Sequence, residues 1–523
     1  MLESFIKKLN DLSERRDDAS TQSTLEKNIY ISKSLKKNLA ELKNMTGESS
    51  DVVFRSFCIG KTDAAIVYID GLASAQEIEE SVIKTLVYGV PAADWRPKDI
   101  DEILESQLIS SEIKKTDLLN DLIDGFLMGD TALLIDGFRQ GAVINTKGFQ
   151  MRAITDPQTD SVIRGPREGF VENIRTNTAL LRRKIRNTSF RFDSMETGRQ
   201  TKTKIAIAYL NDVADPELIA TVKKRISKID TDAIIDSGYI EQYIEDSPLS
   251  IFSTISYTEK PDIAAGKILE GRAAIIVDGS PFVLTAPSLF VENFESPEDY
   301  YIGPVAATMI RLIRYLSYFI SILVLPTYVA FTTFHQELIP TAFLYTMAAA
   351  EAGTPFPSFV EALLMIIVFE ILKESGVRLP KPVGQAVSIV GALVIGESAV
   401  SAGIIGAPMV IAVAITAVSA FVIPNQANTI VILRYILLVL GATMGGFGIA
   451  IGLLALFIYL SNLKSFGVPF LAPYSPLRTP DLKDSLVRMP VWAMLTRPTT
   501  FAHRNPRRQK FSKPWEDENA QQN

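Results

Sequence analysis

The stretch "GALVIGESAVSAGIIGAPM", residues 391–409, decides the class of this protein because it places Glu397 inside a long apolar segment. An ionised carboxylate at the centre of a bilayer costs on the order of 3 kcal/mol or more, so such residues are usually functional. No charged residue lies in 398–433 or in 435–463. Uncharged apolar runs longer than about 18 residues are typical of membrane spans. The sequence therefore predicts an integral membrane protein with a polytopic α-helical region over 301–463.

The rest of the chain has the composition of a soluble protein. Of 523 residues 47% are hydrophobic and the formal net charge is −6, but charges recur every few residues over 1–301. This length exceeds one ordinary domain. The mild acidity disfavours nucleic acid as a partner.

The N-terminal region is expected to be cytoplasmic. Its start, "MLESFIKKLNDLSERRDD", has no apolar core, so no cleaved signal peptide is expected. Cys58 is the only cysteine, so no intramolecular disulfide can form. Residues 1–50 are charged and lack apolar periodicity, which indicates an N-terminal arm.

The soluble half contains an internal repeat. "DAAIVYIDGLASAQEIEESVIKTL" from Asp63 and "KIAIAYLNDVADPELIATVKKRISKI" from Lys204 each show a β-branched run followed by a helical pattern. "GDTALLIDGFRQGAVI" from Gly129 and "GRAAIIVDGSPFVLTA" from Gly271 each carry two apolar runs around an Asp-Gly pair, which is a hairpin signal. We therefore expect two tandem similar α/β subdomains, over 51–155 and 200–300.

A segment between the subdomains, 156–199, is expected to be helical. In "GPREGFVENIRTNTALLRRKIRN", from Gly165, acidic residues come early and basic residues late, an order that complements the helix dipole. Two interpretations stay open here: a solvated connecting helix, or a basic surface that docks on anionic lipid or a neighbouring subunit.

No catalytic, cofactor or metal site is expected. The Gly-Lys pair in "AAGKILEGR", from Ala264, lacks the spacing of a phosphate-binding loop, and GxSxG, HExxH and CxxC are absent. Both histidines, His335 and His503, lie outside the soluble half. The sequence therefore predicts a protein that is not an enzyme.

Apolar segments are expected to form the spans 315–334, 357–373, 383–403, 404–424 and 429–461. Arg311 and Arg314 precede the first span, and basic residues recur through the tail, 464–523. Since positive flanks stay in the cytoplasm, both ends are predicted to be cytoplasmic. Five spans would leave the ends on opposite sides. Either Gly445 and Gly446 break the last region into a re-entrant pair, or 338–350 crosses as well.

The third span has two distinct faces at 100° per residue. One face carries Val390, Val394, Glu397 and Ser401. The opposite face, suited to close helix packing, carries Ser388, Ala392, Gly396, Ala399 and Gly403. Around an axis, copies of the first face would give rings of valine and glutamate, which can gate and select cations. The alternative is that Glu397 is protonated or hydrogen-bonded in a packed bundle.

Glu361 and Glu370 are two further intramembrane acids. One interpretation is a functional role within the membrane. The other, which we expect, is that they reach the interface, because they lie near helix ends.

The stretch "PFPSFVEALLMIIVFEILKESGVRLPKPVGQAVSIVGALVIGESAVSAGIIGAPMVIAVAITAVSAFVIPN", residues 355–425, closely resembles the A subunit of GerA-type spore germination receptors. "GPREGFVENIRTNTALLRRKI" and "DGSPFVL" are similar to the cytoplasmic domain of that family. The resemblance spans about 50–490. A stage V sporulation protein of the AF type shares these motifs.

This resemblance implies a protein of the spore inner membrane. It implies two partners, a transporter-like B subunit that binds the germinant and a lipoprotein C subunit. It also implies self-association, possibly as a pentamer, into a nutrient-gated ion channel. The rival hypothesis is a non-conducting scaffold that anchors the B and C subunits. A secondary transporter would be built from inverted repeats, and none is visible in the apolar half.

Overall fold

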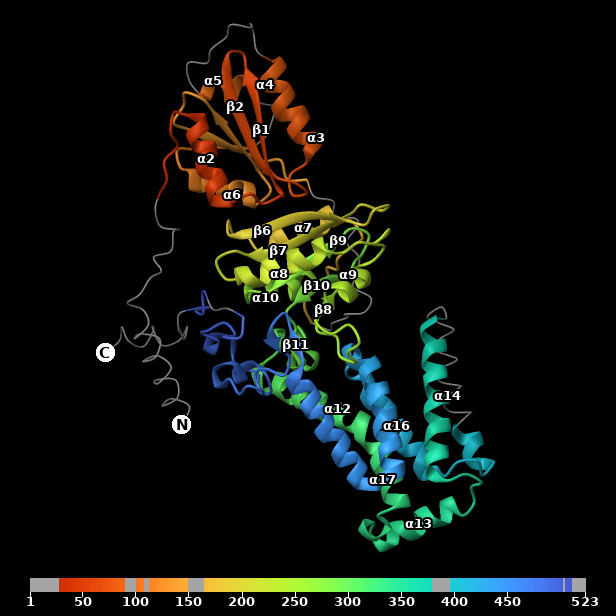
Figure 1. Ribbon diagram of the computed structural model, residues 1–523. Coiled ribbons are helices and arrows are strands. Elements are labelled where there is room, and N and C mark those ends of the chain that lie inside the picture. The colour runs from red at the N-terminus through yellow and green to blue at the C-terminus, as the bar shows by residue number, and fades with distance from the viewer. Residues whose placement is uncertain are drawn as a thin grey trace, which may run out of the picture. The chain divides into compact units, whose positions relative to one another are not determined.

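The computed structural model describes residues 28–89, 100–107, 112–148, 164–378, 396–501 and 504–509. The chain divides into two compact units. The first comprises 1–149 with 186–188, and the second comprises 150–185 with 189–523. Figure 1 shows one α/β subdomain in the first unit, and a second α/β subdomain, a helical region and a C-terminal segment in the second.

The first unit is built on a five-stranded antiparallel sheet of order β1-β2-β4-β5-β3. Its strands are β1 (Val52–Ile59), β2 (Thr62–Ile69), β3 (Ile113–Thr116), β4 (Thr131–Ile135) and β5 (Gly141–Ile144). Its helices are α2 (Leu35–Thr46), α3 (Ala75–Glu77), the π-helical η1 (Ile78–Ile83), α4 (Lys84–Tyr88), α5 (Ile100–Gln107) and α6 (Leu119–Leu127).

Helices cover both faces of this sheet (Figure 1). The strand pattern explains why, since successive side chains of a strand point to opposite faces and those of the central strands are buried on both. Ala64 and Ile66 of β2 share one core with η1, α4 and α5. On β2 the helices α2 and α6 also pack. The result is a three-layer α/β/α subdomain.

The second unit repeats this architecture with the sheet order β6-β7-β9-β10-β8. Its strands are β6 (Phe190–Thr197), β7 (Thr203–Leu210), β8 (Ser256–Thr258), β9 (Ala273–Val277) and β10 (Val283–Ala286). Its helices are α7 (Ile174–Lys184), α8 (Pro216–Ser227), α9 (Ser237–Ile244) and α10 (Pro261–Leu269). One core joins the sheet to α7 and α10, and another joins it to α8 and α9. The matching strand orders confirm the predicted tandem α/β subdomains.

The repeat begins earlier than the sequence boundaries placed it. Asn38 and Asn177, each within the helix that precedes its sheet, close matching six-residue loops. Asn38 accepts from Ser32 N–H and donates to Ser32 O at 2.8 and 2.6 Å. Asn177 does the same with Val171 at 2.8 and 2.5 Å. Residues 28–50 and 164–199 are therefore parts of the subdomains and not an arm and a connector.

The helical region of the second unit follows the short α11 (Glu298–Tyr301). It comprises α12 (Pro304–Thr333), α13 (Thr341–Glu351), α14 (Ser358–Arg378), α16 (Ala407–Phe421) and α17 (Ala427–Asn462). Within the described residues, two helices are long and apolar enough to cross a membrane, Pro304–Thr333 and Pro424–Asn462, and Ala407–Phe421 is a shorter apolar helix. The first continuous helix thus starts eleven residues before the predicted span at 315.

The last apolar region is a helical hairpin. Gly445 has φ +61° and interrupts the helical backbone of α17. Thr429 Oγ1 donates to Ile251 O at 2.8 Å, and Tyr459 Oη donates to Ser250 Oγ at 2.8 Å. Both ends of α17 therefore reach the same loop, which a straight helix of this length cannot do. The structure therefore has the first of the two predicted alternatives, a break of the last apolar region at the glycines. The segment of the second alternative forms α13, an eleven-residue helix with a single buried residue.

The described part of the tail, 464–501 and 504–509, is folded. It begins with a two-stranded ribbon, β11 (Lys464–Ser465) and β12 (Val468–Pro469), followed by the 3₁₀ turns η6 (Thr479–Asp484) and η7 (Val491–Ala493). Ser465 Oγ donates to Thr254 O at 2.6 Å, which joins the ribbon to the second α/β subdomain. The tail is thus part of the second unit's core.

Candidate functional site in the helical region

The predicted pore-lining face is described only in part. Val390 and Val394 lie outside the described residues, as do Ser388 and Ala392 of the predicted packing face. Residues 396–401 are helical, with Glu397 and Ser401 exposed.

The opposite face of the same turns points into the chain. Gly396 is buried, Gly403 is half-buried, and Ala399 packs against the core shared by α12, α14 and α16. Glu397 thus lies on a face that the described part of the chain leaves exposed. That this face lines a pore stays a prediction.

The prediction that Glu361 reaches the interface is wrong. Glu361 is 1% exposed, and its Oε2 accepts from Gly406 N–H at 3.1 Å. Gly406 is the N-cap of α16, where unpaired N–H groups and the helix dipole favour a negative charge. Ala350 also lies against Gly406, so the end of α13 helps to close this site. Burial here comes from tertiary contacts that the helix-end position does not reveal.

Glu370 lies in an ion-pair cluster. It is half-buried, and its carboxylate lies 3.3 Å from Lys373 Nζ and 3.8 Å from Arg434 Nη1. Arg434 is 2% exposed and donates from Nε to Ser321 O at 3.0 Å. This cluster joins α12, α14 and α17. A buried guanidinium requires such partners. The sequence signal for this cluster was Arg434 itself, a single charge that interrupts a long apolar run.

His335 is a functional candidate that sequence reasoning did not single out. Its Nε2 accepts from Gly446 N–H at 3.0 Å, which fixes the end of α12 against the hairpin bend. An N–H group freed by a helix break needs such an acceptor. A lone histidine between two apolar segments was the available signal.

A buried charge network links α12 to the α/β subdomain and the tail. Arg311 and Asp299 are both 0% exposed, and Arg311 Nε donates to Asp299 Oδ2 at 3.1 Å. Arg311 Nη1 donates to Asp484 O and Oδ1 at 2.7 and 3.1 Å. Arg314 pairs with Asp299 at 2.8 Å. Arg311 was read from the sequence only as a positive flank, but here it holds three segments together.

Two acids of this network are hard to ionise. Burial, and next the negative charge of Asp484, raise the pKa of the Glu295 carboxyl well above its ordinary value. Burial likewise raises the pKa of Asp484, against the opposing effect of Arg311. The Glu295 and Asp484 carboxyl groups therefore keep protons at pH values at which exposed carboxyl groups are ionised.

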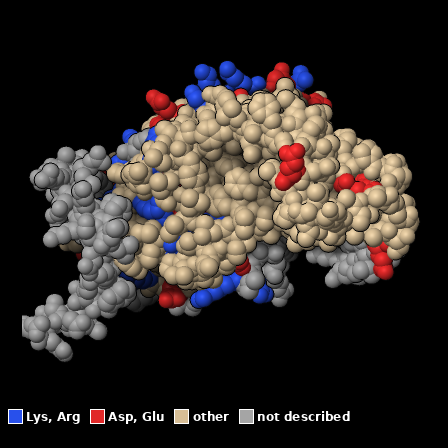
Figure 2. All heavy atoms as spheres, turned by 90° about the horizontal axis from the view of Figure 1, so that it is seen from below, with Lys and Arg blue, Asp and Glu red and all other residues tan. Residues whose placement is uncertain are grey.

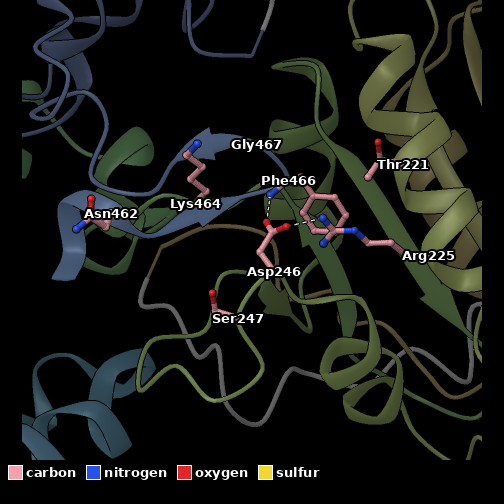
Figure 3. Close-up of a pocket in the computed structure, with 8 residues that line it drawn as sticks. All are labelled: Thr221, Arg225, Asp246, Ser247, Asn462, Lys464, Phe466 and Gly467. Atoms are coloured by element: carbon pink, nitrogen blue, oxygen red, sulfur yellow. Dashed lines mark hydrogen bonds and ion pairs between the residues drawn. The ribbon is translucent and has the colours of Figure 1, made fainter.

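A shallow pocket of about 510 Å³ lies where the hairpin returns to the α/β subdomain (Figure 3). Its lining residues are Thr221, Arg225, Asp246, Ser247, Asn462, Lys464, Phe466 and Gly467. The Arg225 guanidinium pairs with Asp246 and stacks on the Phe466 ring at 4.4 Å. Asp246 also accepts from Phe466 N–H. Through these contacts, the residues that line the pocket hold α8 against the tail ribbon.

The lower face of the molecule is mostly uncharged. Figure 2 shows few acidic or basic side chains near its centre, more toward its edge, and a hollow near the middle. Exposed large apolar residues line the helices, among them Leu316, Phe319, Ile411, Ile415, Phe421, Val439, Phe447, Leu454 and Phe457. Apolar surface of this extent indicates contact with lipid or protein. Among the described residues, no group of three or more His, Cys, Asp or Glu side chains could hold a metal.

A family model described as "Bacillus/Clostridium GerA spore germination protein" matches residues 40–500. The chain belongs to this GerA family. It is 44% identical to spore germination protein KA of Bacillus subtilis (strain 168) over 493 residues. This alignment covers 93% of this chain and 90% of the relative. It is 36% identical to spore germination protein GerLA of Bacillus cereus, over 88% of this chain and 94% of the relative.

Two further proteins are similar to this GerA-family chain, one over most of its length and one over about half of it. It is 42% identical to the uncharacterized membrane protein YfkQ of Bacillus subtilis (strain 168), over 94% of this chain and 96% of the relative. The crystal structure of the N-terminal domain of the A subunit of the Bacillus megaterium spore germinant receptor GerK3 matches with TM-score 0.41 and 34% identity. That match covers 51% of this chain and 99% of the other.

Proposed function

We propose that this GerA-family protein is the A subunit of a spore nutrient germinant receptor in the spore inner membrane. It assembles from several copies into a nutrient-gated ion channel that triggers germination, with both ends of the chain cytoplasmic. It acts with a transporter-like B subunit and a lipoprotein C subunit, and we assign it no enzymatic reaction. The family membership supports the receptor role, and the names of the relatives support the link to germination.

The exposed Glu397 carries the proposal of a conducting path. In an apolar helical region, an uncovered carboxylate requires water or a polar partner. Copies of the same helix arranged around an axis would enclose a water-filled path, and water would solvate this carboxylate. The glycine and alanine face is meanwhile used inside the chain, so the Glu397 face is the one available for such a ring.

Ionic current through the purified chain in planar bilayers tests this proposal. Val394→Ala should raise the unitary current because it widens an apolar constriction, and Glu397→Gln should weaken cation selectivity because it removes the charge. The matched control is Glu374→Gln, an exposed acid that pairs with Arg378 on α14. It should leave both properties at parental values.

The rival is a non-conducting scaffold for the B and C subunits, which a stage V AF-type paralogue could also be. In a scaffold, Val394→Ala should only loosen packing, by about 0.5–1.5 kcal/mol. Bilayers that stay silent with a verified oligomer and with both partner subunits present would favour the scaffold.

A further inference from the structure

The helical region contains a buried polar cluster, formed by Glu361, Glu351 and Ser358, that the proposed pore face does not use. Glu361, in the first turn of α14, is 1% exposed. Its Oε2 accepts from Gly406 N–H, but its Oε1 is buried and has no hydrogen-bond donor among the described residues. An orphan oxygen on a buried carboxyl is costly in either protonation state.

Further oxygen atoms gather beside this carboxyl. Ser358 Oγ donates to Glu351 Oε1 at 2.7 Å, and Thr332 Oγ1 donates to Ser358 Oγ at 3.2 Å. Ser358 and Glu361 lie one helical turn apart on α14, so their side chains share a face. Both carboxylates are near enough to Tyr328 for electrostatic interaction. Three helices, α12, α13 and α14, therefore contribute oxygen atoms to this cluster, and the N-terminus of α16 contributes an N–H group.

The charge of this cluster is not balanced within the described residues. None of the ion pairs found there involves Glu351 or Glu361, unlike Glu370, which lies beside Arg434. The N-terminus of α16 supplies only about half a positive charge. A buried carboxylate with one N–H donor and a half-charge is under-compensated.

We propose that this cluster binds a small monovalent cation, with Glu361, Glu351 and Ser358 as ligands. All the available ligand atoms are oxygen, which suits hard cations and not the metals that prefer nitrogen or sulfur. Ca²⁺ takes six to eight oxygen ligands and Mg²⁺ requires near-ideal octahedral geometry. The single fully buried carboxylate, that of Glu361, balances one positive charge, which suits Na⁺ or K⁺.

This inference goes beyond the proposed function and does not assume conduction. Its readout is cation binding by the protein in detergent, in which no current is measured. A failure of the cation site therefore leaves the channel proposal standing, and a silent bilayer leaves the cation site standing.

Thermal unfolding of the full-length protein tests the site, with Na⁺ or K⁺ replacing N-methylglucamine at constant ionic strength. The unfolding midpoint should rise and saturate, because a ligand that binds only the folded state stabilises it. Glu361→Gln should raise the half-saturating concentration at least about tenfold. Glu374→Gln, on the same helix but exposed, should keep the parental concentration.

Two results would overturn the site: no cation-specific rise in the parent, or the same rise in Glu361→Gln. If Glu361→Gln does not fold, Glu351→Gln and Ser358→Ala decide, since each should weaken saturation in the same direction. Saturation by Ca²⁺ or Mg²⁺ but not by Na⁺ or K⁺ would overturn the assignment to a monovalent ion.

Discussion

Single residues of the buried charge network around Arg311 decide how the second α/β subdomain is held to α12. Glu295 lies 3.8 Å from Arg311 Nη1 and close to the charge of Asp484. Its raised pKa means that the folded state keeps a proton that the unfolded chain releases. Below the ordinary glutamate value of 4.5 both states are protonated and stability is complete. As the pH rises toward the folded-state pKa, the free energy of unfolding must fall.

We expect Glu295→Gln to flatten this pH dependence. A glutamine cannot ionise, so its burial carries no protonation linkage, whereas Asp484 still contributes in the same direction. Unfolding midpoints between about pH 5 and about pH 8 measure the slope. Glu196→Gln, at an exposed acid on β6, is the control and should keep the parental slope. Equal slopes in all three proteins would mean that Glu295 ionises freely.

Whole elements show what the sequence could predict. The two Asp-Gly hairpins, β4–β5 and β9–β10, formed as predicted because a tight turn depends on local residues. Helix α7 was predicted as a helix between the subdomains, either solvated or docking through a basic surface. It is nevertheless in the core, because Arg182, 1% exposed, lies over the rings of Phe190 and Phe192 at 4.7 and 5.2 Å. Periodicity cannot show polar burial of this kind.

The candidate site was less predictable than the fold. Glu361 meets Gly406 across 45 residues, and His335 meets Gly446 across 111. Such contacts depend on how the helices pack against one another, and the order of residues along one chain does not reveal this packing. The sequence did mark the acids and the glycines as unusual, because apolar segments exclude charge and helices disfavour glycine.

The hairpin of α17 yields a prediction at two glycines. A Cβ at Gly448 would lie 2.3 Å from Leu440 O, a backbone atom of the other arm, so Gly448→Ala should destabilise the protein by about 1–3 kcal/mol. Gly266, inside α10, has open space around it, so Gly266→Ala should stabilise by about 0.5–1 kcal/mol. Unfolding midpoints of the two variants should move in opposite directions. A neutral Gly448→Ala would mean that the arms do not touch there.

Over the whole second unit, the tail and the sheet form one body. Arg272, 4% exposed, pairs with Glu270 at 3.1 Å and with Glu292, and it lies 4.2 Å from the ring of Phe501. Glu292 precedes the segment that carries Glu295 and Asp299 to Arg311. A displacement of the sheet would therefore reach α12 through packed and paired groups. Such a connection is what the second α/β subdomain needs in order to influence α12.

Assembly of the whole molecule can be tested through the two faces of the third span. In a chain whose Cys58 is replaced by serine, Ser401→Cys puts the only thiol on the exposed face, and Ala399→Cys puts it on the face packed inside the chain. If copies meet around the Glu397 face, a short bis-maleimide should link Ser401→Cys subunits in membranes into dimers. Ala399→Cys should give far fewer dimers, because its side chain is partly buried against the core of its own α12, α14 and α16. Dimers from Ala399→Cys alone would show that the ring forms through the opposite face, and Glu397 would then point away from any shared axis.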